Sequence, residues 1–264
     1  METVRSADGV PIAFERWGEG PPVVAVHGSD TTHRSWRPFA DQFGGFEVYA
    51  MDRRGRGESG DGDGYTVDRE VADVEAVVEH VAKESADTSP DSGGVALVGH
   101  SFGGLPAFEA ARRTDAVSRL VLYEPPALHE AHRARHATLV ADVERRVADG
   151  DVAGALRQFE REAAGVSEAV LERVDWERAA AMAEQTRREV ASVAAYRAPA
   201  ASGIAVPTCC LLGEESPAYL HETTRGLADA IPDSRVETLS GVGHLATLTD
   251  PAQLADAVGV FLRG

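Results

Sequence analysis

The chain has 264 residues, and its 26 Lys and Arg against 43 Asp and Glu give a formal net charge of −17 at pH 7. This charge excludes the basic surface with which proteins bind nucleic acid, and no apolar run approaches the length of a membrane span, so we expect neither partner. The length is sufficient for one large α/β domain or two small ones.

The first part of the chain alternates short apolar runs with amphipathic stretches. Residues 1–20 predict two strands that meet at the turn signal Asp8-Gly9, and buried strands follow at 23–26 and 46–51. Valines at helical spacing predict a helix over residues 66–83.

The rest of the chain repeats this alternation around a long helical stretch. Residues 127–198 are rich in Ala, Arg and Glu, contain no strand-like run and predict several amphipathic helices, with a linker at 199–203. Further strands are predicted at 95–98, 119–124, 206–212 and 235–239, and further helices at 105–112, 216–231 and 251–262. Strands that alternate with helices indicate a parallel sheet with right-handed crossovers.

Polar side chains directly follow several of the predicted strands. They are Ser29, Ser101, Glu124, Glu215 and His244. The carboxyl ends of parallel strands meet at one edge of a sheet, which is where such sheets bind ligands. We therefore expect these side chains to surround one site.

Residues 99–103, Gly-His-Ser-Phe-Gly, stand between a predicted strand and a predicted helix. In that context a Gly-x-Ser-x-Gly pattern predicts a nucleophile elbow, a sharp turn that projects the hydroxyl of Ser101. Glycines on either side let the neighbouring backbone approach closely. The N–H of Phe102 would open the helix and point at a developing oxyanion. For this pattern alone, an ordinary turn with an N-cap serine is the simpler alternative.

A serine hydroxyl is a weak nucleophile and requires a base, for which histidine is suited near neutral pH. His244 is the candidate, because it lies in a Gly-x-Gly-His turn directly after the last predicted strand. The base in turn requires an acidic residue that fixes its tautomer.

Together with these motifs, His27-Gly28 and the run 52–59 make the chain similar to the α/β-hydrolase fold family over nearly its whole length. The resemblance implies an α/β fold with a mostly parallel eight-stranded sheet, flanking helices and an inserted helical cap. The core domain would comprise residues 1–126 and 199–264, and the cap residues 127–198.

The position of the acid departs from the usual pattern of the family. Family members usually carry an Asp after the seventh strand, at a position that is Ser216 here, so that Glu215 or Glu214 would have to substitute. The other candidate is Glu124 at the end of the sixth strand, where certain haloalkane dehalogenases of this fold place a Glu. Because the residue before a proline avoids the helical region, Pro125 predicts that Glu124 is extended at the strand end. We expect Glu124 to be the acid, with Glu215 as the alternative and a purely structural role for Glu124 as a further one.

The resemblance also implies an activity. Backbone N–H groups of Ser29 and Phe102 would form an oxyanion hole, and Ser101 would attack a small carboxylic ester or related acyl substrate to give an acyl-enzyme, without a cofactor. A C–C bond hydrolase, a lactonase or a cofactor-free perhydrolase would use the same residues. A binding protein that retains them without turnover is the alternative from a different functional class.

Three further features favour simple interpretations. His129, His132 and His136 could share one helix face, but their spacing is not that of a zinc protease, and we expect a cap surface rather than a metal site.

The neighbours Cys209 and Cys210 would point to opposite faces of a strand, which argues against a bridge and fits a reducing cytoplasm. The N-terminus has no apolar stretch typical of a signal peptide, so we expect a cytoplasmic protein.

The basic residues are almost all arginine, since Lys83 is the only lysine. Strong acidity with almost no lysine favours a surface adapted to high salt, because screening relieves the repulsion between like charges. A genome that favours arginine codons is the alternative explanation.

Overall fold

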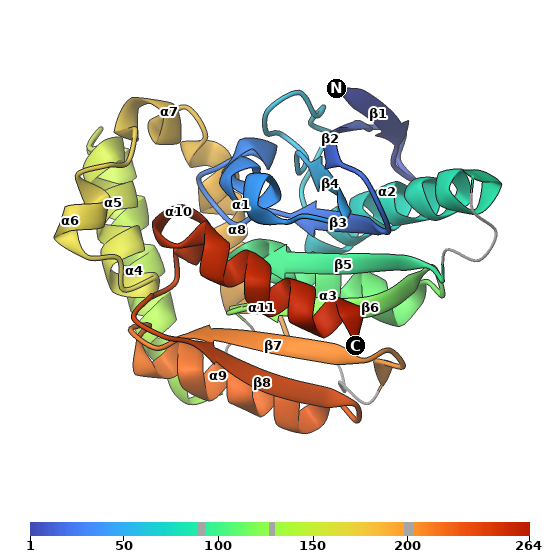
Figure 1. The fold of residues 1–264 in the computed structure, drawn as a ribbon. Helices are drawn as coiled ribbons and strands as arrows, with labels where there is room; N and C mark the ends of the chain where they lie inside the picture. Colours follow the sequence, from blue (N-terminus) through green and yellow to red (C-terminus); the bar gives the residue numbers. More distant parts are fainter. Residues whose placement is uncertain (89–92, 127–129, 198–202) are drawn as a thin grey trace.

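The computed structural model describes residues 1–88, 93–126, 130–197 and 203–264. Within them, eight strands form one sheet in the order β1-β2-β4-β3-β5-β6-β7-β8 (Figure 1). The strands are β1 (Glu2–Arg5), β2 (Pro11–Gly18), β3 (Pro22–Val26), β4 (Glu47–Met51), β5 (Val95–His100), β6 (Val117–Tyr123), β7 (Thr208–Gly213) and β8 (Ser234–Leu239). β2 runs antiparallel to both its neighbours and every other pairing is parallel, which confirms the expected mostly parallel eight-stranded sheet.

Helices cover both faces of this sheet. They are α1 (Arg37–Gln42), α2 (Val67–Thr88), α3 (Gly104–Arg113), α9 (Ala218–Ala230) and α11 (Pro251–Arg263). Alternate residues of β3 enter two separate apolar clusters: Val24 packs in the cluster that includes residues of α2, α3 and α9, and Val23 in the cluster that includes residues of α1 and α11. A strand buried on both faces must be apolar at every position, which explains the continuous apolar runs of the sequence.

Between β6 and β7 the chain forms α4 (Glu130–Ala148), α5 (Val152–Ala163), α6 (Glu168–Leu171), α7 (Trp176–Ala180) and α8 (Ala183–Ala195), which we call the cap helices. In Figure 1 the elements α4 to α7 lie beyond the carboxyl ends of the parallel strands. Two of them pack on each other through a small apolar cluster of their own, which joins Leu139 and Val143 of α4 to Ala155 of α5. The amphipathic pattern of this stretch therefore forms a separate layer rather than a part of the main core.

Two local features differ from the sequence prediction. The predicted helix over 66–83 continues to Thr88 as α2, and a short helix α10 (Ala246–Thr249) follows the last strand. A helix of four residues is too short to show the spacing of apolar residues on which the prediction depends. Across the described residues no helix combines the length and the apolarity needed to cross a lipid bilayer.

Candidate active site

Ser101 lies at the carboxyl end of β5, where the chain turns into a 3₁₀ segment (Ser101–Gly103) and then into α3. Its φ angle is +50°, in the left-handed region that residues other than glycine rarely adopt. A Cβ atom at Gly103 would stand 2.3 Å from the carbonyl oxygen of His27, and one at Gly99 would stand 2.7 Å from the Cα atom of Gly104. Glycines are therefore required on both sides of the turn that presents the Ser101 hydroxyl.

Glu124 and His244 meet at the ends of β6 and β8. The Nδ1 atom of His244 lies 2.6 Å from Oε2 of Glu124, and the backbone N–H of Gly213 donates to Oε1 of Glu124 over 2.7 Å. The Glu124 side chain has no solvent exposure and that of His244 is 6% exposed. A carboxylate that accepts a hydrogen bond from Nδ1–H fixes the tautomer in which Nε2 is free to act as a base.

The alternative acids lie elsewhere. Glu215 is exposed, and its backbone N–H donates to the carbonyl of Val242 over 2.9 Å. Glu214 is also exposed and accepts the backbone N–H of Gly241 over 2.8 Å. The carboxylate that contacts the imidazole is thus that of Glu124.

Two residues that the sequence did not single out hold the loop that carries His244. The Nε2 atom of His100 lies 2.9 Å from the carbonyl oxygen of His244, and the two imidazole rings are 4.9 Å apart. Burial lowers the pKa of His100 to about 3, so its ring is neutral and donates to that carbonyl. The hydroxyl of Tyr123 donates to the carbonyl of Gly243.

Ser101 and His244 open into a cavity of about 410 Å³ between the sheet and the cap helices. Ser29, Phe102 and Glu124 also line it from the core, and residues of the cap helices that line it include His136, Phe159, Glu160, Trp176 and Val193. The volume lies in the range of sites for small organic molecules. The structure therefore brings the predicted site residues, except Glu215, to one enclosed space.

The sequence missed a pair of carboxyl groups in the wall of this cavity. Asp30, which follows Ser29, lies beside Glu160 of α5, and its Oδ1 atom accepts the hydroxyl of Thr186 of α8. Burial raises the pKa of Glu160 to about 8, and the neighbouring charge of Asp30 acts in the same direction. Burial likewise raises the pKa of Asp30 to about 6. Two neighbouring buried carboxyl groups repel each other when both are ionised, so each favours the protonated form of the other.

This pair predicts a pH-dependent stability. The pKa values of about 6 and about 8 in the folded chain lie above the ordinary values of 3.8 and 4.5. At pH values between the ordinary and the raised pKa of each group, the folded chain therefore binds more protons than the unfolded chain. The free energy of unfolding that this pair contributes is therefore fully present below about pH 4 and falls as the pH rises to about 8. Replacing Glu160 with Gln keeps a donor for Asp30 at every pH. At pH 9 we expect Glu160→Gln to melt about 2–4 °C above the wild type.

The measurement is the melting temperature from pH 5 to pH 9. The control is Glu162→Gln, a change of the same charge on the exposed face of the same helix, which should follow the wild-type curve. Parallel curves for wild type and Glu160→Gln would contradict the raised pKa values of this pair.

The structure describes two of the three histidines of the cap, and each of the two has a polar neighbour. His129 lies outside the described residues, Nε2 of His132 lies 2.8 Å from Glu222, and Nε2 of His136 lies 3.4 Å from the carbonyl of Val190. No group of three His, Cys, Asp or Glu among the described residues could hold a metal ion.

Residues 23–257 match the family model described as "Alpha/beta hydrolase family". A non-heme haloperoxidase of Rhodococcus erythropolis is 34% identical over 128 residues, which are 46% of this chain and 43% of that protein. Lipase LipV of Mycobacterium tuberculosis is 30% identical over 129 residues, which are 48% of this chain and 46% of that protein. The matched segments thus span less than half the length of these curated relatives.

Solved structures match over the full chain. An α/β hydrolase from Sphaerobacter thermophilus is 30% identical with a TM-score of 0.80, and the match covers 99% of this chain and 100% of that one. An esterase from Exiguobacterium antarcticum shares the fold at 20% identity and a TM-score of 0.78, with 99% of each chain covered. With its eight-stranded sheet, its strained serine turn and the family match over residues 23–257, the chain belongs to the alpha/beta hydrolase family.

Proposed function

We propose that this hydrolase cleaves a small carboxylic ester, or a related acyl compound, through a covalent acyl-enzyme on Ser101. The observation that carries the proposal is the 2.6 Å contact between Glu124 and His244 in the wall of the cavity that also contains Ser101. A nucleophile, a base and a group that orients the base are the parts that covalent acyl transfer requires.

The proposed reaction has two halves. The oxygen of Ser101 attacks the carbonyl carbon while Nε2 of His244 takes the serine proton, and Glu124 stabilises the imidazolium. The backbone N–H groups of Ser29 and Phe102 hold the oxyanion. The bond to the leaving alcohol then breaks, and the alcohol departs with the proton from His244. Water attacks the acyl-enzyme with His244 as base and releases the acid and Ser101.

A specific observation favours one second candidate. Two curated relatives, each 34% identical over part of the chain, are named as a non-heme haloperoxidase and a non-heme chloroperoxidase. In a perhydrolase, hydrogen peroxide would replace water in the second half-reaction, and the acyl-enzyme would release a peracid. Measuring peracid formed from acetate and hydrogen peroxide distinguishes this candidate from ester hydrolysis.

The test of the proposal is labelling with a fluorophosphonate probe and turnover of p-nitrophenyl esters of increasing acyl length. We expect the probe adduct on the peptide that contains Ser101, and an acyl-length optimum set by the cavity of about 410 Å³. A wild-type protein that neither binds the probe at Ser101 nor turns over any acyl substrate would instead favour a binding protein.

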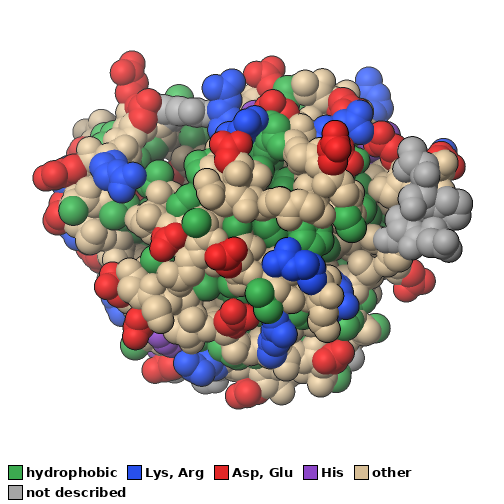
Figure 2. All heavy atoms as spheres, viewed as in Figure 1, with side chains coloured by type: hydrophobic (Ala, Val, Ile, Leu, Met, Phe, Trp, Pro, Cys, Tyr) green, Lys and Arg blue, Asp and Glu red, His purple; other side chains and the backbone are tan. Residues whose placement is uncertain are grey.

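The same assay tests the expected adaptation to salt. Figure 2 shows Asp and Glu side chains spread over the visible face, and the net charge is −17. Screening by salt weakens repulsion between exposed charges. We therefore expect turnover and stability to be higher in molar KCl than at low salt.

A further inference from the structure

One helix of the cap contacts both residues of the proposed oxyanion hole. Glu189 of α8 accepts the hydroxyl of Ser29 over 2.7 Å. Val193 and Tyr196, one and two turns further along the chain, pack in the same apolar cluster as Phe102. The hole therefore depends on an element outside the sheet that carries Ser101.

From the core, Arg53 contacts Phe102 and Gly28, the residue before Ser29. Its guanidinium lies over the Phe102 ring, 4.4 Å from the ring centre, and its Nη1 atom donates to the carbonyl of Gly28 over 3.1 Å. Gly28 and Ser29 share one peptide group, in which the C=O and the N–H point in opposite directions. A donor that holds the Gly28 carbonyl on one side therefore orients the Ser29 N–H toward the other.

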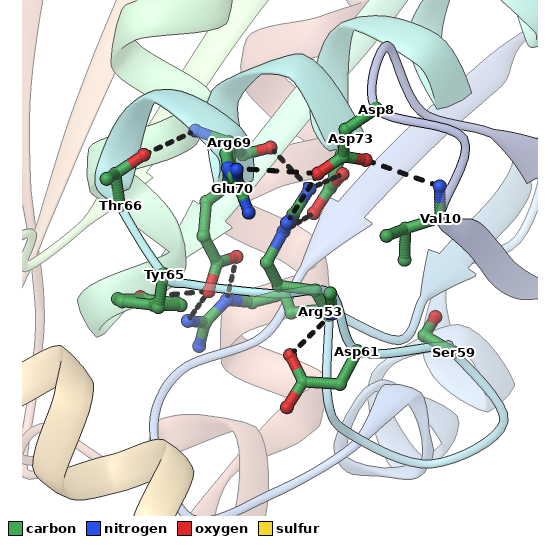
Figure 3. Close-up of polar contacts among 12 residues, drawn as sticks. Asp8, Val10, Arg53, Ser59, Asp61, Tyr65, Thr66, Arg69, Glu70 and Asp73 are labelled. Atoms are coloured by element: carbon green, nitrogen blue, oxygen red, sulfur yellow. Dashed lines mark hydrogen bonds and ion pairs between the residues drawn. The ribbon is translucent and has the colours of Figure 1, made fainter.

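The core and cap contacts join into a closed ring. Arg53 forms an ion pair with Glu189. It also pairs with Glu70, whose Oε1 atom lies 2.7 Å from Nη2 of Arg53, and Figure 3 shows these two side chains together. The ring thus runs from the Ser29 hydroxyl to Glu189, from Glu189 to Arg53, and from Arg53 to the carbonyl of Gly28. The carbonyl of the Gly28–Ser29 peptide group and the side chain that follows it are thus both held by charged groups, which leaves the peptide group little freedom to turn.

Arg53, Arg56, Glu70 and Glu189 form a buried charge cluster, in which each charge is stabilised by its partners. Arg53, Glu70 and Glu189 have no solvent exposure, and Nη2 of Arg56 lies 2.7 Å from Oε1 of Glu189. A buried charge without its partner is strongly unfavourable, so Glu189 cannot leave the two arginines at little cost. The cluster keeps α8, and the peptide group attached to it, in one arrangement.

We propose that Glu189 is a positioning residue for the oxyanion hole, so that the hole is complete only when α8 is docked on the core. The proposal rests on the function proposed above. It makes the cap a part of the machinery that stabilises the transition state, in addition to a wall of the cavity. A group that acts on the oxyanion alone changes kcat and leaves KM nearly unchanged.

The test uses Ser29→Ala, which removes the hydroxyl that Glu189 accepts but keeps the backbone N–H. We expect kcat to fall about tenfold with KM unchanged within about twofold. The affinity for a boronate inhibitor, which becomes a tetrahedral anion on Ser101, should fall by the same factor. The affinity for a neutral product alcohol should not change, because it carries no oxyanion.

A second variant tests whether Glu189 acts through the same contact as the Ser29 hydroxyl. Glu189→Gln weakens the ion pairs with Arg53 and Arg56, so we expect a loss of kcat at least as large as that of Ser29→Ala. Adding Ser29→Ala to Glu189→Gln should cause less than half the further loss in log kcat that Ser29→Ala causes alone, since the two residues act through one contact. Should Glu189→Gln fail to fold, the Ser29→Ala result alone tests the proposed role of Glu189.

The matched control is Ser192→Ala, which removes a half-buried hydroxyl of the same helix that donates to the carbonyl of Arg188. It should leave kcat, KM and boronate affinity at wild-type values. Wild-type kcat and boronate affinity in Ser29→Ala would overturn the role of Glu189. Failure of the underlying function is distinguishable, because it would show as absent turnover in the wild type itself.

Discussion

Replacing Glu124 with glutamine should lower kcat on a p-nitrophenyl ester by about 10³–10⁴-fold, the range that is typical for loss of the acid in such triads. Both carboxylate oxygens accept a donor: Oε1 accepts the N–H of Gly213, and Oε2 lies 2.6 Å from Nδ1 of His244. An amide has a single acceptor oxygen, so one donor must face an NH₂ group. If that donor is Nδ1, the imidazole takes the other tautomer, and its Nε2 atom carries a proton and is lost as a base.

Glu215→Gln is the control, because it removes the same charge from a carboxylate that the structure places in solvent. We expect its kcat to stay within about twofold of the wild type, as is usual for exposed positions. Normal turnover in Glu124→Gln together with a collapse in Glu215→Gln would show that the acid is Glu215. The melting temperature of each variant separates loss of activity from loss of fold.

The serine and histidine of the site could be predicted because their signals are local. The turn over residues 99–103 has glycines where a Cβ would collide with the backbone, and it stands between a strand and a helix that are evident from the apolar pattern. His244 follows the last strand within a glycine turn. Each signal occupies a few consecutive residues, so it can be recognised without knowledge of the tertiary structure.

The choice between two acids required tertiary structure. Glu124 and Glu215 both follow strands, and no local pattern states which carboxylate turns toward the histidine. The order of the sheet places β6 beside β7, where the N–H of Gly213 reaches Oε1 of Glu124. The extended conformation expected for Glu124 from Pro125 is wrong, because Glu124 adopts a φ of +47°, in the left-handed region.

The contacts between cap and core left no signal in the sequence at all. Glu160 and Glu189 belong to amphipathic helices of a chain with 43 acidic residues, where a glutamate usually marks a solvated face. Their partners Asp30, Ser29 and Arg53 are more than a hundred residues away in the chain. Because such pairs form only when the cap docks, neither the spacing nor the composition of either segment predicts them.

Replacing Ser101 with alanine should lower kcat by about 10⁴–10⁶-fold and leave a small residual rate from the remaining groups of the site. The change removes the nucleophile, so the burst of p-nitrophenol that marks an acyl-enzyme should vanish as well. The control is Ser35→Ala, which removes another hydroxyl from the cavity wall, one that donates to the carbonyl of Thr32. It should retain the burst and nearly all of the rate.

The double variant Ser101→Ala with Glu124→Gln asks whether the two residues act as one unit. In the proposed mechanism Glu124 contributes only through His244, and His244 has no proton to take once the serine hydroxyl is absent. The double variant should therefore be no slower than Ser101→Ala alone, although the two separate losses would multiply if the residues acted independently. A multiplicative loss in kcat would mean that Glu124 serves the reaction by a route other than His244, and that the bond between them holds the fold rather than the base.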